Sequence, residues 1–189
     1  MKDYRYLIIG GGMAAATAVK SIRKHDAEGS LAILGEEEHP PYKRPPLSKG
    51  LWKGKPLKMV WMGVDNQDVD LYLGRRAVSL DPTEKIVTDD RGEKYRYEKL
   101  LIATGGATIH LPFGGDQVIY YRTLDDYERL RELAQPDVRF GVIGGGFIGS
   151  EIAAALAMQG ADVVMVFPEP GIGAHNYPKD LSDFITQYY

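Results

Sequence analysis

The chain reads Tyr6-Leu7-Ile8-Ile9-Gly10-Gly11-Gly12-Met13-Ala14-Ala15 near its start, and this stretch decides the fold. Its apolar residues predict a short buried strand, its glycines a tight turn, and the small residues after them the start of a helix. The turn fits the dinucleotide-binding pattern Gly-x-Gly-x-x-Gly/Ala through Gly10, Gly12 and Ala15. Gly10 lets the chain turn sharply, Gly12 lets the backbone approach a pyrophosphate, and Ala15 lets the helix pack close to the strand. Free amides and the helix dipole then favour a phosphate at the turn.

The same unit occurs twice. In the first copy a second strand, Leu31–Glu36, ends in the acid Glu36, which is placed to accept hydrogen bonds from the ribose hydroxyls of an adenosine. The second copy begins with an apolar strand, Phe140–Ile143, and a turn with glycines at 144, 146 and 149. It continues with a helix, Phe147–Gln159, and a strand, Ala161–Glu169, that ends in the acid Glu169. The alternative is two ordinary βαβ units without a nucleotide. Two complete units at nearly equal spacing favour two nucleotide sites.

Composition limits the classes of protein. The chain has 189 residues, 44% of them hydrophobic, and a net charge of −3, enough for one full domain and part of a second. No apolar run approaches the ~20 residues needed to span a membrane, and no signal-peptide core is present, so we expect a soluble, cytoplasmic protein. The absence of cysteine excludes disulfides and thiolate chemistry, and the mild acidity argues against a nucleic-acid partner. We predict no metal site and a surface position for the four histidines, which lack metal-ligand spacing: His25, His39, His110 and His175.

Further elements follow from local patterns. The proline-rich segment His39–Trp52 predicts a stiff, ordered path, with a short helix beginning at Leu47. Alternating residues around a turn predict a hairpin within residues 85–97. Leu100–Gly106 is predicted to be a fully buried strand that ends in small residues, and Leu124–Leu133 an amphipathic helix.

Four blocks stand in one order: Gly10–Gly12, Arg44–Lys49 (Arg-Pro-Pro-Leu-Ser-Lys), Ala103–Gly105 and Gly144–Glu151. With them the chain resembles, over nearly its whole length, the FAD-dependent pyridine-nucleotide oxidoreductases of the ferredoxin reductase and apoptosis-inducing-factor type. The Arg-Pro-Pro-Leu-Ser-Lys block is specific to that branch. The resemblance implies an α/β fold with two Rossmann-like, three-layer units: an FAD-binding domain at residues 1–115 and a truncated NAD-binding domain at 116–189.

The resemblance also implies roles for residues. FAD would be bound by residues of the first turn and of later blocks: Gly10, Gly12, Met13, Ala14, Ala15, Glu36, Arg44, Lys49, Val78, Thr104, Gly105 and Arg122. NAD would be bound by residues of the second unit: Gly144, Gly146, Phe147, Ile148, Gly149 and Glu169. Lys49, Glu151 and Phe147 are the implied catalytic residues, with Phe147 between nicotinamide and flavin and Lys49 near flavin N5.

The residues alone leave alternatives open. Arg44 and Lys49 also fit a solvated basic loop, Arg122 a surface ion pair, and Phe147 helix-start packing. For Glu151 the alternative is an acid favoured by the helix dipole, an effect of ~0.3–1 kcal/mol. The family pattern instead implies a Lys49–Glu151 pair across the two domains, with the charged atoms within about 4 Å.

The implied reaction is hydride transfer from NADH to FAD, with electrons passed to a ferredoxin-like protein or a small-molecule acceptor. The alternative is a redox-sensing interaction protein, of the apoptosis-inducing-factor kind, whose assembly NADH controls; a homodimer fits this reading. Glu169 stands where the 2′-phosphate of NADPH would lie and no Arg or Lys follows until Lys179, which favours NADH. The absence of cysteine excludes disulfide reduction.

Length is the departure from the family pattern, whose members run to about twice this length. We therefore expect the N-terminal part of such a protein, or a form that lacks the later segments. Such a chain supplies the adenosine and pyrophosphate half of an FAD site and is expected to be inactive by itself.

Overall fold

The computed structural model describes all 189 residues. They divide into two compact units, residues 1–43 with 57–107 and residues 44–56 with 108–189. Each unit has its own sheet, with Leu7–Ile9 in one and Val142–Ile143 in the other, which confirms the prediction of two separate units. The predicted domain ranges place residues 44–56 in the first domain, whereas these residues fold with the second unit. Which unit binds FAD and which binds NAD stays a prediction.

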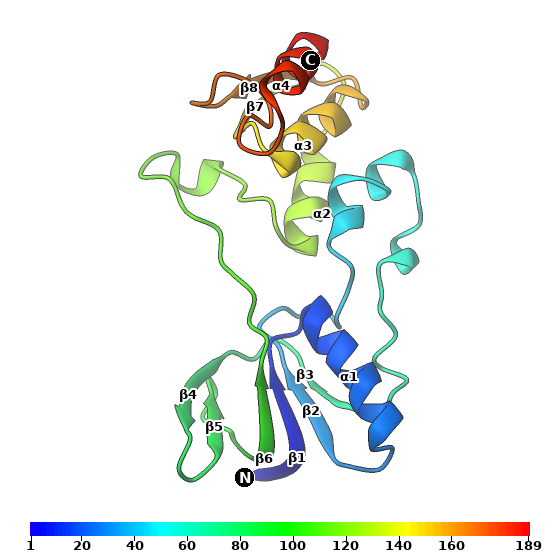
Figure 1. The fold of residues 1–189 in the computed structure, drawn as a ribbon, viewed down its shortest axis with the longest axis vertical. Coiled ribbons are helices and arrows are strands. Elements are labelled where there is room, and N and C mark those ends of the chain that lie inside the picture. The colour runs from blue at the N-terminus through cyan, green and yellow to red at the C-terminus, as the bar shows by residue number, and fades with distance from the viewer. The chain divides into compact units, whose positions relative to one another are not determined.

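The first unit is built on a six-stranded sheet with the strand order β3-β2-β1-β6-β5-β4. Figure 1 shows its parallel strands side by side, with α1 against one face. The strands and helix of this unit are β1 (Lys2–Ile9), α1 (Met13–His25), β2 (Leu31–Leu34), β3 (Asp70–Tyr72), β4 (Ala77–Asp81), β5 (Ile86–Asp89) and β6 (Lys94–Ile102). Strands β3, β2, β1 and β6 pair in parallel, while β6, β5 and β4 pair antiparallel.

Both faces of the central strands are covered, as their continuous apolar sequence requires. On one face Ile8 and Ile33 pack against Ala15, Ala16 and Val19 of α1. On the other face Leu7, Ile9 and Leu34 pack against residues of the β5–β6 hairpin, among them Val87, Tyr95 and Tyr97. The first unit therefore has the three predicted layers: a helix, a parallel sheet and an antiparallel hairpin.

Strand β6 corrects one prediction. Leu100–Gly106 was expected to be a fully buried strand, but β6 runs from Lys94 to Ile102 and pairs with both the hairpin and the parallel sheet. Leu101 and Ile102 are 40% and 59% exposed. At this end β6 pairs with β1 alone, because its pairing with β5 is limited to Lys94–Arg96.

The hairpin between β5 and β6 is held by one buried acid. Asp89 accepts hydrogen bonds from the backbone N–H groups of Arg91 (3.0 Å) and Glu93 (2.9 Å) and from the hydroxyl of Tyr95 (2.9 Å). Its carboxylate also pairs with Arg75 at 2.9 Å and has no exposed surface. The predicted hairpin is thus confirmed, and its turn is fixed by an internal ion pair.

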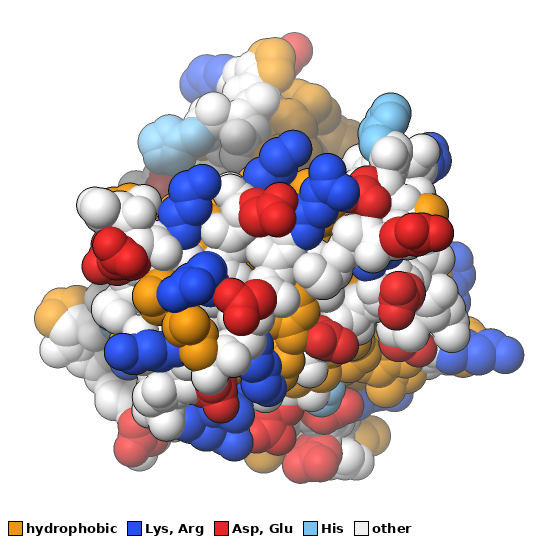
Figure 2. Space-filling view, turned by 90° about the horizontal axis from the view of Figure 1, so that it is seen from below, with side chains coloured by type: hydrophobic (Ala, Val, Ile, Leu, Met, Phe, Trp, Pro, Cys, Tyr) orange, Lys and Arg blue, Asp and Glu red, His pale blue; other side chains and the backbone are white.

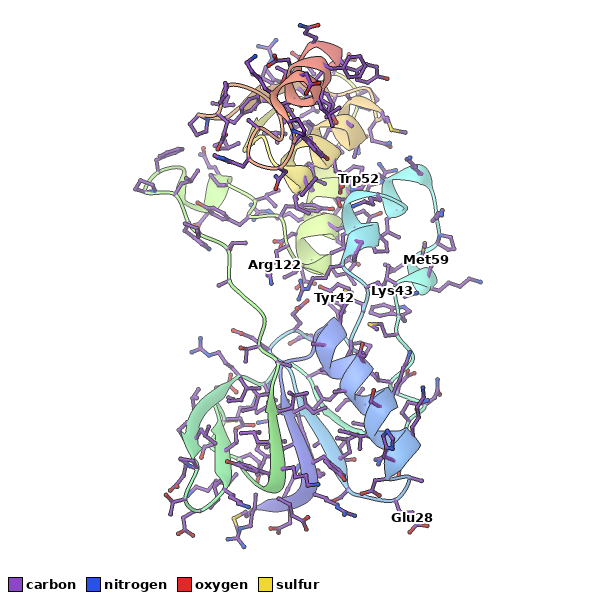
Figure 3. All side chains as sticks on the ribbon, viewed as in Figure 1. Glu28, Tyr42, Lys43, Trp52, Met59 and Arg122 are labelled. Atoms are coloured by element: carbon purple, nitrogen blue, oxygen red, sulfur yellow. The ribbon has the colours of Figure 1, made fainter.

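The second unit has a two-stranded parallel sheet and three α-helices. Its elements are the 3-10 helices η1 (Pro45–Ser48), η2 (Leu51–Lys53) and η4 (Gly115–Gln117), then α2 (Leu124–Leu133), β7 (Arg139–Ile143), α3 (Phe147–Ala157), β8 (Asp162–Val166) and α4 (Lys179–Tyr188). Their core joins α2, α3 and Trp52 of η2; Trp52, labelled in Figure 3, lies beside Tyr127 of α2 with ring centroids 5.7 Å apart.

Two predictions for this unit need correction. The helix expected from Leu47 to Trp52 is instead a pair of 3-10 turns. Their N–H groups bond to carbonyls three residues back, as Lys49 does to Pro46 and Lys53 to Gly50. Helix α4 was not predicted, and only Ser182 of its ten residues is fully buried. The predicted helix Leu124–Leu133 is confirmed in full, with Thr123 and Asp126 forming a capping box at its start.

The surface mixes charges of both signs. On the face in Figure 2, Lys and Arg side chains alternate with Asp and Glu, in keeping with the net charge of −3. No helix of the molecule has the length and apolar character needed to cross a bilayer.

Candidate functional site

The first glycine turn joins β1 to α1 at the carboxyl edge of the parallel strands. Gly10 adopts φ +110°, and its N–H donates to the carbonyl of Leu34 at 2.8 Å. A Cβ atom on Gly10 would lie 2.2 Å from the carbonyl oxygen of Ala103, so two of the motif blocks meet here. Gly12 is the N-cap of α1, and a Cβ atom placed on it would have no atom within 4 Å. The turn therefore combines a crowded inner glycine with an outer one that faces open space, which fits a pyrophosphate at the helix N-terminus.

The other FAD-contact residues predicted in the first unit lie on several elements. Ala15 is fully buried under the sheet, whereas Met13 and Ala14 are exposed in the first turn of α1. Glu36 follows β2 and is exposed. Val78 on β4 is 54% exposed, and Thr104 with Gly105, where φ is +69°, follows β6. Apart from Ala15, these residues are exposed and available to a ligand, and their roles stay predictions.

The second glycine turn repeats this arrangement between β7 and α3. Gly144 adopts φ +116° and donates to the carbonyl of Val166 at 2.8 Å. Gly146 is the N-cap of α3, and its Cβ position again has no atom within 4 Å. The crowded position here is Gly149, where a Cβ atom would lie 2.0 Å from the carbonyl oxygen of Gly144. Helix α3 therefore starts in close contact with its own turn, as the third small position of the pattern requires.

Beside this turn lies an apolar hollow of about 520 Å³, lined by residues of β7, of α3 and of the segment that precedes α2. Ile148 and Gly149 belong to its wall, whereas Phe147 does not. Phe147 and Ile148 are 51% and 50% exposed. The first turn of α3 thus presents apolar surface beside a site suited to phosphate.

The segment after β8 folds back over the second turn. Gly173 donates its N–H to the carbonyl of Gly145 at 2.7 Å, and Tyr177 packs edge-on against Phe147 with ring centroids 5.7 Å apart. Glu169, predicted to hold the NAD ribose, lies 3.2 Å from Nε2 of His175. His175 was predicted only as a surface residue. Loop residues have no periodicity, so the sequence carried no signal for either His175 or Tyr177 as neighbours of this site.

The proline-rich segment is rigidly held within the second unit. The carbonyl of Leu47 accepts hydrogen bonds from Nε1 of Trp52 at 2.8 Å and from the hydroxyl of Tyr121 at 2.6 Å. Burial raises the pKa of Tyr121, so this phenol remains a donor. Arg44 donates from Nη1 to the carbonyl of Arg122 at 2.7 Å, which brings two predicted FAD contacts together. These bonds favour an ordered segment over the alternative of a solvated basic loop.

Lys49 and Glu151 form the ion pair that was expected. Nζ of Lys49 lies 2.7 Å from Oε2 of Glu151, although the two residues are 102 positions apart. The expected distance is confirmed, but both residues belong to the second unit, so the pair does not join two domains as expected. The hydroxyl of Ser48 donates to the same oxygen at 2.6 Å. Ser48 was not among the predicted site residues.

The two glycine turns define a class of protein. Each turn stands between a parallel strand and a helix and lies beside a second strand that is followed by an acid, Glu36 in one unit and Glu169 in the other. This is an α/β protein with two dinucleotide-binding units. A family model described as pyridine nucleotide-disulphide oxidoreductase matches residues 4–189. The chain belongs to this family.

Individual relatives confirm the branch that the motifs predicted. Apoptosis-inducing factor 1, mitochondrial, of Dictyostelium discoideum is 31% identical, over 99% of this chain and 40% of that protein. The ferredoxin–NAD(+) reductase component of the 3-phenylpropionate/cinnamic acid dioxygenase of Photorhabdus laumondii is 31% identical, over 98% of this chain and 49% of that protein. The covalent putidaredoxin reductase–putidaredoxin complex has a TM-score of 0.88 at 25% identity and covers 100% of this chain and 48% of that one. The chain thus spans about half the length of its curated relatives.

Proposed function

We propose that this protein is an NADH-dependent flavoprotein oxidoreductase that passes electrons from NADH through FAD to an acceptor. The observation that supports it most directly is the repeated turn with an open second glycine, at Gly12 and at Gly146. Two such turns provide for two dinucleotides in one chain. A protein that binds a single nucleotide needs only one such turn.

The residues of each turn fit such a ligand. The N-caps of α1 and α3, Gly12 and Gly146, border open space, and no acidic side chain stands in the first turn of either helix. Glu36 and Glu169 are placed to accept hydrogen bonds from ribose hydroxyls. The bound flavin would supply the chemistry, accepting a hydride and releasing electrons singly. In this proposal the Lys49–Glu151 pair provides a cation that favours negative charge on the flavin.

The acceptor that we propose is a ferredoxin-type protein. Two of the relatives support it, because one is the ferredoxin–NAD(+) reductase component of a dioxygenase and another was solved in complex with putidaredoxin. A small-molecule acceptor is the alternative, since a monodehydroascorbate reductase of Arabidopsis thaliana is 32% identical over 100% of this chain and 48% of that protein.

An absorbance spectrum of the purified full-length protein, of which this chain is expected to be the N-terminal part, tests the central claim. We expect flavin bands that bleach when NADH is added without oxygen and return when an oxidised ferredoxin is supplied. Recovery with monodehydroascorbate but with no ferredoxin would assign the smaller acceptor. A protein that binds no flavin, even after incubation with FAD, would contradict the proposal.

A second function is supported by the relative from Dictyostelium, an apoptosis-inducing factor. In this reading NADH changes the assembly of the protein and little substrate turns over. Sedimentation with and without NADH separates the two functions. A dimer that forms only with NADH, with negligible acceptor reduction, would favour the sensing role.

We predict that Glu169 makes the protein prefer NADH to NADPH. Its carboxylate would repel a 2′-phosphate and accept a hydrogen bond from the 2′-hydroxyl of NADH. Glu169→Arg should therefore shift the ratio of kcat/KM for NADH over NADPH by at least about tenfold toward NADPH. Steady-state rates with both nucleotides measure this ratio.

The matched control is Glu128→Arg, which makes the same charge change at an exposed position of α2. It should leave the ratio unchanged. If Glu169→Arg keeps the preference for NADH, or if the control shifts the ratio equally, Glu169 does not determine which of the two nucleotides is preferred.

A further inference from the structure

The carboxylate of Glu151 has two donors of different kinds. Ser48 and Lys49 both bond its Oε2 atom, at 2.6 and 2.7 Å. The serine is 5% exposed, whereas the lysine side chain is 54% exposed and that of Glu151 is 27% exposed. Ser48 therefore donates from a short, buried side chain, whereas Lys49 donates from a long, flexible side chain that is open to solvent.

The buried donor is held in place independently of Glu151. Ser48 is the last residue of η1, and the carbonyl next to it, that of Leu47, accepts hydrogen bonds from Trp52 and Tyr121. Trp52 is itself 3% exposed. The position of the serine hydroxyl is therefore fixed by the hydrogen-bonded backbone beside it. The four-carbon stem of Lys49, in contrast, lets its ammonium move.

We infer that Ser48 is a positioning residue: it holds Glu151 in place so that Lys49 can leave the carboxylate for another anionic group. A partly buried carboxylate that lost its only donor would be left unsatisfied, which is costly. With Ser48 bonded to the same oxygen, the carboxylate keeps a partner when the ammonium moves. The hydroxyl also competes with the ammonium for that oxygen, which weakens the ion pair.

This role rests on the proposed function in one respect, since the anionic group that Lys49 would serve there is the reduced flavin. The competition between Ser48 and Lys49 is a property of the chain itself. It can therefore be tested without FAD, and a failure of the flavin proposal is separable from a failure of this inference.

The experiment measures the acylation rate of Lys49 by pulse labelling of the full chain with acetic anhydride and mass spectrometry, with the exposed Lys20 of α1 as the internal reference. In Ser48→Ala the ammonium no longer shares Oε2 and is held more tightly. We expect labelling of Lys49 to slow by roughly two- to tenfold, the range of one net hydrogen bond. If Ser48 served only to keep the segment folded, its loss would loosen the segment, and labelling would become faster.

Two further variants make the result specific. In Glu151→Gln labelling of Lys49 should become faster, because the carboxylate charge that holds the ammonium is removed. Adding Ser48→Ala to that variant should not change the labelling rate further, because Ser48 and Lys49 no longer compete for a charged oxygen. Ser182→Ala is the matched control, since Ser182 is 3% exposed in the same unit and donates to the carbonyl of Ile172 instead. It should leave Lys49 unaffected. Faster or unchanged labelling in Ser48→Ala, or an equal effect without Glu151, would overturn the inference.

Discussion

Gly10→Ala is expected to unfold the first unit, whereas Gly12→Ala is expected to leave it folded. The backbone of Gly10 has φ +110°, and a methyl group there would lie 2.2 Å from the carbonyl oxygen of Ala103. That oxygen belongs to the chain that leaves β6, which is paired with β1, so it cannot move away without breaking the sheet. Backbone strain and overlap together should cost at least ~3 kcal/mol of the free energy of unfolding.

Gly12 is the matched control within the same turn. It has φ −93°, which any residue adopts, and its Cβ position has no atom within 4 Å. Gly12→Ala should cost no more than ~1 kcal/mol, the effect of a poorer N-cap. It should nevertheless weaken FAD binding by at least about tenfold, because the methyl group fills the space that a pyrophosphate would take.

Urea titrations followed by circular dichroism measure the stability of both variants, and FAD titrations measure binding. Equal stability of Gly10→Ala and the parent chain would show that the close approach to Ala103 does not exist in solution. Unimpaired FAD binding by Gly12→Ala would instead place the pyrophosphate elsewhere.

Asp89→Asn is expected to lower the free energy of unfolding by about 3–5 kcal/mol, the usual cost of removing one partner from a buried ion pair. The carboxylate has no exposed surface and pairs with Arg75, whose side chain is 20% exposed. The asparagine amide cannot neutralise that guanidinium, and its NH2 group would face donors. Asp90→Asn, one residue along and exposed, is the matched control and should cost less than ~1 kcal/mol.

The same carboxylate should give stability a particular dependence on pH. Burial alone would raise the pKa of Asp89, but the Tyr95 hydroxyl, the two backbone N–H groups and the charge of Arg75 together hold that pKa below its ordinary value. The unfolded chain then binds the proton more readily than the folded one. This contribution is complete above the ordinary aspartate pKa of ~3.9 and is lost as the pH falls toward the folded value.

Urea titrations between pH 2.5 and 6 measure the effect. The parent chain should lose stability on acidification more steeply than Asp89→Asn, in which this group is absent. Parallel curves for the two proteins would show that Asp89 titrates alike in the folded and unfolded states.

Much of the fold could be predicted because its signals are local. Helix α2 has the predicted bounds, since its capping box and apolar positions are complete within a few residues. Strand β2 begins at Leu31 as predicted but ends at Leu34, two residues before Glu36. Helix α4 was missed although Leu181, Phe184, Ile185 and Tyr188 recur at helical spacing in its sequence. Only Ser182 of its ten residues is fully buried. The two 3-10 turns, Pro45–Ser48 and Leu51–Lys53, were expected to be one helix. The sequence indicates a helical segment here, but it does not show whether each carbonyl bonds to the N–H group three or four residues later.

The two glycine turns and the acids that follow them could be recognised from local sequence, because the positive φ at Gly10 and Gly144 is a requirement that glycine meets without help from distant residues. The contacts between distant groups depend instead on how the chain folds back on itself. Ser48 and Lys49 share one oxygen of Glu151 more than a hundred positions later in the chain, and residues 44–56 fold with the second unit. Such pairings depend on where the chain returns and on which donors stay buried there, and no local pattern records that.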